Sequence, residues 1–116
     1  MAPRLRLRSG PELREITRTR RAERDPFFSV HVRPNKLGHA RMGMTVSRRV
    51  SPKAVVRNRI KRRIRESFRV TQALLAGLDL VVVARTPAAT AEHTALRESL
   101  QRHWNKAQAS CRSCSS

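Results

Sequence analysis

Residues 53–69 read KAVVRNRIKRRIRESFR and hold eight basic residues but only one acidic residue, Glu66. At the α-helical repeat of about 100° per residue, the apolar side chains of this stretch fall on one side and most of its cations on the other. The pattern predicts a long helix that rests on a hydrophobic core and presents a row of cations to a partner. The expected core-facing residues are Val56, Ile60, Ile64, Ser67, Phe68, Thr71, Leu74 and Leu75. The expected outward-facing residues are Asn58, Lys61, Arg62, Arg65 and Arg69.

The flanking residues indicate where this helix begins and ends. Ser51 is suited to the N-cap position and Pro52 to the first helical position. Gly77 is a suitable stop, because glycine readily adopts the left-handed conformation that ends many helices. A helix of about 24 residues between these limits would be roughly 36 Å long.

The whole chain is strongly basic. Its 116 residues include 26 Lys and Arg but only 8 Asp and Glu, so the formal net charge is +18. A compact domain with this excess repels itself unless it meets a polyanion, and a domain this basic usually binds nucleic acid. The sequence has no apolar run of about 18 residues and no apolar signal-peptide core near its start. We therefore expect a cytoplasmic protein with a nucleic-acid partner and no membrane contact.

Hydrophobic periodicity predicts two strands before the basic helix and one after it. Residues 27–33, FFSVHVR, alternate with Phe28 on the apolar face, and residues 40–47 form the second strand. The turn residues 34–38 between them, PNKLG, suggest that these two strands form a hairpin. Residues 80–85, LVVVAR, are a short apolar run typical of a strand that is covered on both faces.

Two further helices are expected at the ends of the chain. Residues 11–19 begin with a proline suited to a first helical turn, and residues 18–24 form a basic connector or a short edge strand. Residues 91–107 follow Thr90 as a possible cap and form the last helix. Its apolar face comprises Leu96, Leu100 and Trp104, and the tryptophan is expected in the core.

The predicted elements describe one small α+β domain, a sheet with helices packed on it. We expect a single RNA-binding domain over residues 1–116, with an ordered core at about residues 5–107. The tails, residues 1–4 and 108–116, are expected to be mobile.

Three segments that follow one another along the chain resemble segments of a known family. Residues 54–68, AVVRNRIKRRIRESF, resemble the "RNR" signature of the bacterial ribonuclease P protein component. Residues 43–50, GMTVSRRV, resemble the strand that precedes this signature in the family. Residues 79–87, DLVVVARTP, resemble the family's last strand and its exit. With a looser match at residues 5–16, the resemblance covers residues 4–107.

The resemblance implies a fold and a function. The family fold is a small α-β sandwich of order αβββαβα, in which the strand–helix–strand crossover, here residues 42–85, is left-handed against the usual rule. The family's protein joins a large catalytic RNA and helps it cut the 5′ leader from precursor tRNA. The RNA carries the chemistry through bound magnesium ions, so the resemblance implies no catalytic residue, metal ligand or cofactor in the protein itself.

The resemblance also implies two RNA-facing surfaces. The first would bind the catalytic RNA and comprises Arg48, Arg49, Lys53, Arg57, Asn58, Arg59, Lys61, Arg62, Arg65 and Arg69. The second is a cleft for the unpaired leader, between the first helix and the sheet, and comprises Leu13, Arg14, Thr17, Arg18, Phe27, Val30 and Arg33. Leu13, Thr17 and Val30 stand where many members carry aromatic residues, so leader contacts should depend more on cations. Phe28 is expected in the core, whereas Phe27 fits core and cleft equally well.

Three other functions compete with this interpretation. A structural ribosomal protein would share the charge, but the signature in its strand context argues against it. A basic-zipper DNA-binding helix needs a heptad seam, for which residues 71–77 are too short, so no DNA partner is expected. A protein-only ribonuclease would need paired acid–base groups or a two-metal carboxylate cluster. The sequence has no DxD-type cluster, and its histidines are scattered at His31, His39, His93 and His103.

The two cysteines, Cys111 and Cys114, form a lone CxxC pair near the end of the chain. Zinc needs four ligands, and His103 stands at no recognised spacing from this pair. We expect reduced thiols in a polar tail rather than a metal site.

Overall fold

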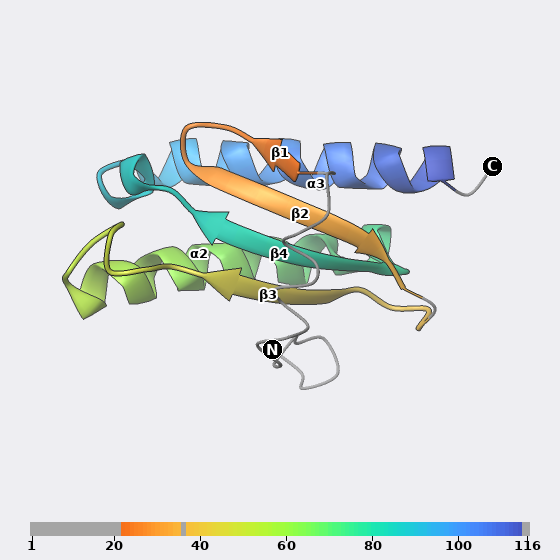
Figure 1. Cartoon of the computed structure of the whole chain (residues 1–116), viewed down its shortest axis with the longest axis horizontal. Helices are drawn as coiled ribbons and strands as arrows, with labels where there is room; N and C mark the ends of the chain where they lie inside the picture. Colours follow the sequence, from red (N-terminus) through yellow and green to blue (C-terminus); the bar gives the residue numbers. More distant parts are fainter. Residues whose placement is uncertain (1–21, 36, 115–116) are drawn as a thin grey trace.

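The computed structural model describes residues 22–35 and 37–114. A single layer of strands lies against a layer that contains helices α2 and α3 (Figure 1). The elements are β1 (Ala22–Arg24), β2 (Phe28–Pro34), β3 (Arg41–Thr45), α2 (Ala54–Thr71), the 3₁₀ helix η2 (Gln72–Leu75), β4 (Leu78–Ala84), the 3₁₀ helix η3 (Thr86–Ala89) and α3 (His93–Cys114). This arrangement confirms the predicted α+β sandwich. None of the described helices combines the length and hydropathy needed to cross a membrane.

The described strands form one sheet in the order β1-β2-β4-β3. Strand β4 pairs antiparallel with β2 and parallel with β3, so it separates the two strands that were expected to form a hairpin. The hairpin prediction is therefore wrong. The physical reason why β2 and β3 are separated lies in β4, which is buried at six of its seven positions. A strand that is apolar on both faces gains most from the centre of the sheet, where neighbours cover it on every side.

The β3–α2–β4 crossover is left-handed, as the family resemblance implied. In Figure 1 both parallel strands point left, β4 lies above β3, and α2 passes behind the sheet. Helix α3 lies behind the same face, so both helices bury their apolar sides against one side of the sheet. The first helix expected at residues 11–19 lies outside the described residues. Strand β1 confirms the edge-strand alternative for Ala22–Arg24, the described end of residues 18–24.

Both long helices begin later than predicted. Helix α2 starts at Ala54, so Pro52 is not its first residue and Ser51 is not its N-cap. The Ser51 hydroxyl instead accepts a hydrogen bond from the backbone N–H of Lys53, at 3.2 Å. Helix α3 starts at His93 because Thr90 belongs to the turn after η3. It then continues to Cys114, past the predicted end at residue 107.

The core lies between the sheet and the two helices. Its largest fully buried side chains include Phe28, Met42, Ile60, Ile64, Phe68, Leu80, Leu100 and Trp104. Of the predicted core face of the basic helix, Leu74 is an exception, because 60% of it is exposed. The α-helix gives way to a 3₁₀ helix at Gln72. With about three residues per turn instead of 3.6, the chain buries Leu75 and rotates Leu74 outward.

A buried carboxylate ties three strand ends together. Asp79 is 0% exposed and accepts two hydrogen bonds from the Arg41 guanidinium, at 2.9 and 2.7 Å. Asn35 donates a third at 2.7 Å, and Arg33 approaches at 3.3 Å. The sheet register explains the meeting, because Arg33 and Arg41 both pair with Asp79 on neighbouring strands. Bonds from charged donors offset the desolvation of the buried carboxylate.

This network predicts a loss of stability in acid. Burial raises the pKa of Asp79, but hydrogen bonds from Arg41, Asn35 and Arg33 outweigh it and hold the pKa below its usual value of 3.8. A depressed carboxyl pKa stabilises the fold above the unfolded-state pKa, and this stability is lost as pH falls through the folded-state pKa. We expect the urea midpoint to fall below about pH 4. The Asp79→Asn variant, which cannot ionise, should show a smaller fall over the same range, and an equal fall in both proteins would contradict this role.

Candidate nucleic-acid interface

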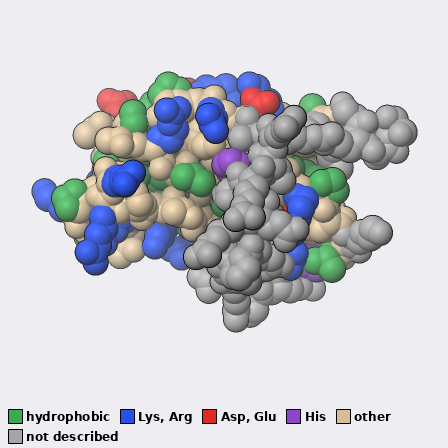
Figure 2. Space-filling model, viewed as in Figure 1, with side chains coloured by type: hydrophobic (Ala, Val, Ile, Leu, Met, Phe, Trp, Pro, Cys, Tyr) green, Lys and Arg blue, Asp and Glu red, His purple; other side chains and the backbone are tan. Residues whose placement is uncertain are grey.

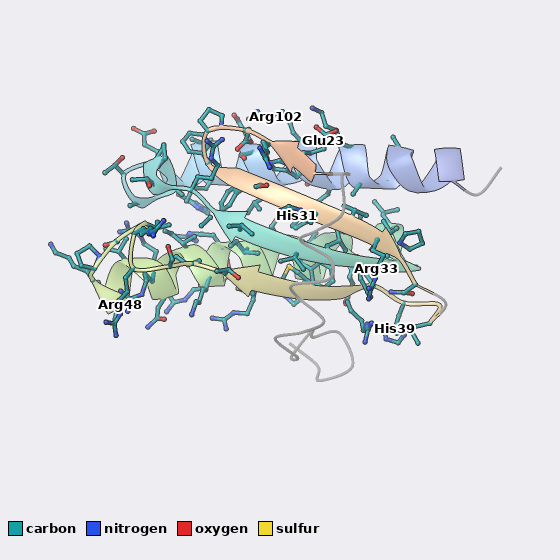
Figure 3. All side chains as sticks on the ribbon, viewed as in Figure 1. Glu23, His31, Arg33, His39, Arg48 and Arg102 are labelled. Carbon is teal, nitrogen blue, oxygen red and sulfur yellow. The ribbon has the colours of Figure 1, made fainter. Side chains whose placement is uncertain are left out.

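The predicted RNA-facing residues form one basic surface, which we define by the ten residues from Arg48 to Arg69 named above. It begins at the connection between β3 and α2 and continues along the outer side of α2. Seven of the ten are exposed: Arg48, Arg49, Lys53, Asn58, Arg59, Arg62 and Arg69. The other three are partly buried: Arg57, Lys61 and Arg65. Figure 2 shows basic side chains gathered over the end of the molecule where α2 begins, and Figure 3 labels Arg48 there.

This surface carries little compensating negative charge. Glu66 is the one acidic residue of α2, and it lies 3.8 Å from Arg63, which is not part of the surface. The first turn of α2 contains no acidic residue and no side-chain cap hydrogen bond. The helix N-terminus therefore adds its partial positive charge to the side chains around it. Such a surface favours phosphate groups, and salt should screen that attraction.

Two arginines of the basic surface donate hydrogen bonds to backbone carbonyls of the protein itself. Arg57 Nη1 donates a hydrogen bond to the backbone carbonyl of Ser51, at 2.9 Å. Arg59 Nη2 reaches the carbonyl of Ala89 at 3.5 Å, a longer and exposed contact. The helical pattern left both arginines off the outward face, and the family resemblance placed them in the RNA-facing set; neither named these carbonyl partners, because helical periodicity shows a direction and not a partner. Arg62 makes no hydrogen bond or ion pair with any residue that the structure describes.

A hollow of about 440 Å³ extends the basic surface beyond α2. It lies where the parallel strands β3 and β4 end, and its lining includes Ser47, Arg49, Arg85 and Thr86. Arg85 is exposed and donates a hydrogen bond to the carbonyl of Asp25, at 2.8 Å. Nothing in the sequence patterns assigned Arg85 to a site. The signal that could have found Arg85 was the strand–helix–strand crossover of residues 42–85 that the family resemblance implied. Ligands of parallel sheets commonly bind at the carboxyl ends of neighbouring strands, and Arg85 follows such an end.

Only part of the predicted leader cleft lies within the described residues. Its first-helix members, Leu13, Arg14, Thr17 and Arg18, lie outside the described residues. Val30 is 1% exposed and belongs to the hydrophobic core, so its placement in a cleft is wrong. It shares with Phe28 the side of β2 that faces the helices. Phe27 is half-buried and packs against the core, while Arg33 is ion-paired with Asp79 at 3.3 Å.

The histidines do not form an acid–base pair in the part of the chain that the structure describes. His31 and His103 are buried, His39 is partly buried and His93 is exposed. Burial lowers the pKa of His31, and the charge of Arg24 lowers it further. Likewise, none of the described His, Cys, Asp and Glu residues gather in a group of three or more that could hold a metal ion.

A Ser–Asp–His cluster in the fold is structural. The Ser99 hydroxyl donates to the carboxylate of Asp25, and His103 Nε2 lies 3.2 Å from the same carboxylate, off the line of a good hydrogen bond. Burial lowers the pKa of His103, which outweighs the attraction of Asp25. A hydrolase would bond its serine to the histidine and expose both to substrate. Here Ser99 is 0% exposed, and the cluster joins the turn after β1 to α3.

Comparisons with known proteins agree with one another. A family model described as Ribonuclease P matches residues 1–108. The ribonuclease P protein component of Methylococcus capsulatus is 46% identical over 99 residues, which are 85% of this chain and 77% of that protein. The one from Chromobacterium violaceum is 40% identical over 111 residues, 96% of this chain and 91% of that protein.

Solved structures show the same likeness in three dimensions. The RNase P protein of Staphylococcus aureus superposes with a TM-score of 0.79 at 31% identity, over 84% of this chain and 90% of that one. The RNase P protein of Thermotoga maritima gives a TM-score of 0.77 at 28% identity, over 87% and 96%.

Proposed function

The chain belongs to the ribonuclease P protein family, and we propose that its basic surface binds the catalytic RNA of ribonuclease P through phosphate contacts. The protein is the subunit of an endoribonuclease that acts in 5′ processing of tRNA, and the RNA partner carries the catalysis. The surface of α2 and of the connection before it is the part of the described chain best suited to that RNA, because its cations are concentrated and largely unneutralised.

The main support for this proposal is the spacing of the outward cations on α2. Lys61 and Arg65 stand four residues apart on α2, as do Arg65 and Arg69, so neighbouring charges lie about 6 Å apart along the helix axis. Arg62 and Arg65 belong to the same face. A row of like charges at this spacing destabilises a free helix. It is favourable when each cation meets a phosphate and releases counterions from the RNA.

The second proposed ligand is the 5′ leader of precursor tRNA. Since Val30 lies in the core, the sheet contributes little apolar floor for unpaired bases. With Val30 excluded, Phe27 and Arg33 are the predicted leader contacts that remain among the described residues, and both are partly buried. Leader binding would therefore depend on cations more than on stacking, with Arg85 beside the hollow as an additional candidate.

The magnesium ions of the reaction are proposed to bind to the RNA. Guanidinium and ammonium groups are donors without acceptor atoms, whereas magnesium takes oxygen ligands. The contribution of the basic surface would be to neutralise phosphates that crowd together around those ions. This role requires no metal ligand in the protein.

Binding and cleavage assays test the function together. We expect the full chain to bind ribonuclease P RNA more tightly than ribosomal RNA of equal length. Affinity should fall by about 0.7–0.9 log units per log unit of salt for each phosphate contact. With magnesium and ribonuclease P RNA, the protein should promote leader removal from precursor tRNA. Turnover by pure protein without the RNA would contradict the proposal, and so would equal affinity for both RNAs.

A further inference from the structure

Arg57 differs from the other cations of the basic surface in its immediate surroundings. Arg57 is partly buried, and its guanidinium donates a hydrogen bond, at 2.9 Å, to the backbone carbonyl of Ser51. Ser51 is itself buried, with 7% of its surface exposed. A charged donor on a buried carbonyl makes a stronger bond than a neutral pair. Arg57 therefore has a partner before any RNA arrives.

The carbonyl that Arg57 binds lies in the β3–α2 connection, residues 46–53. This segment contains a turn but no helix or strand, and three of its residues, Val46, Val50 and Ser51, are buried. Val50 is anchored in the core, and its N–H donates to the carbonyl of Ser47 at 3.1 Å. The N–H of Lys53 donates to the Ser51 hydroxyl at 3.2 Å. Arg57 adds the side-chain bond that joins this segment to the body of α2.

The same connection carries three exposed cations of the basic surface, namely Arg48, Arg49 and Lys53. Their positions relative to α2 depend on the path of the backbone between β3 and the helix. A connection that is ordered before binding avoids the conformational entropy loss that a loose one would undergo on the RNA.

We propose that Arg57 is a positioning residue, which holds the β3–α2 connection against α2 so that Arg48, Arg49 and Lys53 meet the RNA in a fixed arrangement. This inference rests on the proposed function, because it concerns how the same surface binds its RNA. It assigns Arg57 a role that differs from that of Arg62. Both are arginines of α2, but Arg62 is exposed and has no bond to any described residue.

A double-mutant cycle separates the two roles. Arg57→Ala and Arg62→Ala are each made in the wild-type protein and in an Arg48→Ala/Arg49→Ala background, and affinity for ribonuclease P RNA is measured. In the wild type, Arg57→Ala should weaken binding by about tenfold or more, the scale of one charge-assisted hydrogen bond. In the background that lacks Arg48 and Arg49 its effect should shrink to about threefold or less, because the effects of residues that act together are not additive. The effect of Arg62→Ala should be the same in both backgrounds. If the effect of Arg57→Ala on affinity were the same in both backgrounds, as is expected for Arg62→Ala, the inference would be overturned.

Hydrogen exchange in the free protein supplies a readout that does not depend on RNA. The backbone amides of Val50 and Lys53 should exchange at least several times faster in Arg57→Ala, but not in Arg62→Ala. Arg57→Lys, which keeps a cationic donor, should restore part of the protection. Unchanged exchange in Arg57→Ala would also overturn the inference. A wild-type protein that fails to bind ribonuclease P RNA would instead contradict the proposed function, and the exchange result would stand independently.

Discussion

Replacing Lys61, Arg62 and Arg65 together with alanine is expected to weaken binding of ribonuclease P RNA by about a hundredfold or more at 0.1 M salt. Each phosphate contact contributes about 0.7–0.9 to the slope of log affinity against log salt, so loss of three contacts lowers the slope by about 2–3. At 0.1 M salt, this slope makes the affinity about five to eight times higher per contact than it is at 1 M salt. Titration at several salt concentrations measures both quantities.

The same variant should fold as well as the wild type. Alanine is the best helix former, and the substitutions remove like charges that repel one another along α2. Circular dichroism and urea unfolding should therefore show no loss of stability. This expectation distinguishes a binding defect from a folding defect, since the three side chains are outside the hydrophobic core.

A charge-matched control uses α3. Arg97, Arg102 and Lys106 are exposed on that helix, and replacing all three with alanine removes the same charge. If the basic surface binds the RNA, this control should retain affinity within a few-fold. An equal loss in both variants would mean that net charge, and not the surface of α2, determines binding.

Replacing Trp104 with alanine is expected to lower the free energy of unfolding by about 3–5 kcal/mol, the range for buried aromatic residues. Trp104 is 0% exposed and lies edge-on to Phe68, with ring centroids 6.2 Å apart. Its Nε1 donates a hydrogen bond to the Ser67 hydroxyl at 2.7 Å. One side chain of α3 thus holds α2 by packing and by a bond. Domains of this size are stable by about 5–15 kcal/mol, so the loss is a large fraction of the total.

The Trp104→Phe variant is the matched control. It retains an aromatic ring against Phe68 but loses the bond to Ser67, and we expect a smaller loss of about 1–2 kcal/mol. Since Trp104 is the single tryptophan, unfolding is followed by circular dichroism instead of fluorescence. If the alanine variant unfolded at the wild-type urea concentration, Trp104 would not be the link between the two helices.

Several elements were predictable because their signals are local. The faces of α2 follow from the helical repeat, and the structure buries Ile60, Ile64 and Phe68 as predicted. The same periodicity explains the misplaced Val30. It lies on the apolar face of its strand, which the alternation already showed, but the family resemblance had assigned it to the cleft. In this chain the strand pattern was the better guide, because alternation reports burial directly.

The sequence by itself determined the two-sided α2 and the cationic partner surface, because both depend only on the backbone repeat and on the charges along it. The tertiary structure alone decided which groups meet. It placed β4 between β2 and β3, joined Asp79 to Arg33 and Arg41 across 46 and 38 residues of chain, and turned Arg57 onto the Ser51 carbonyl. The physical reason is that periodicity fixes the direction of a side chain, whereas its partner depends on how distant segments pack against one core.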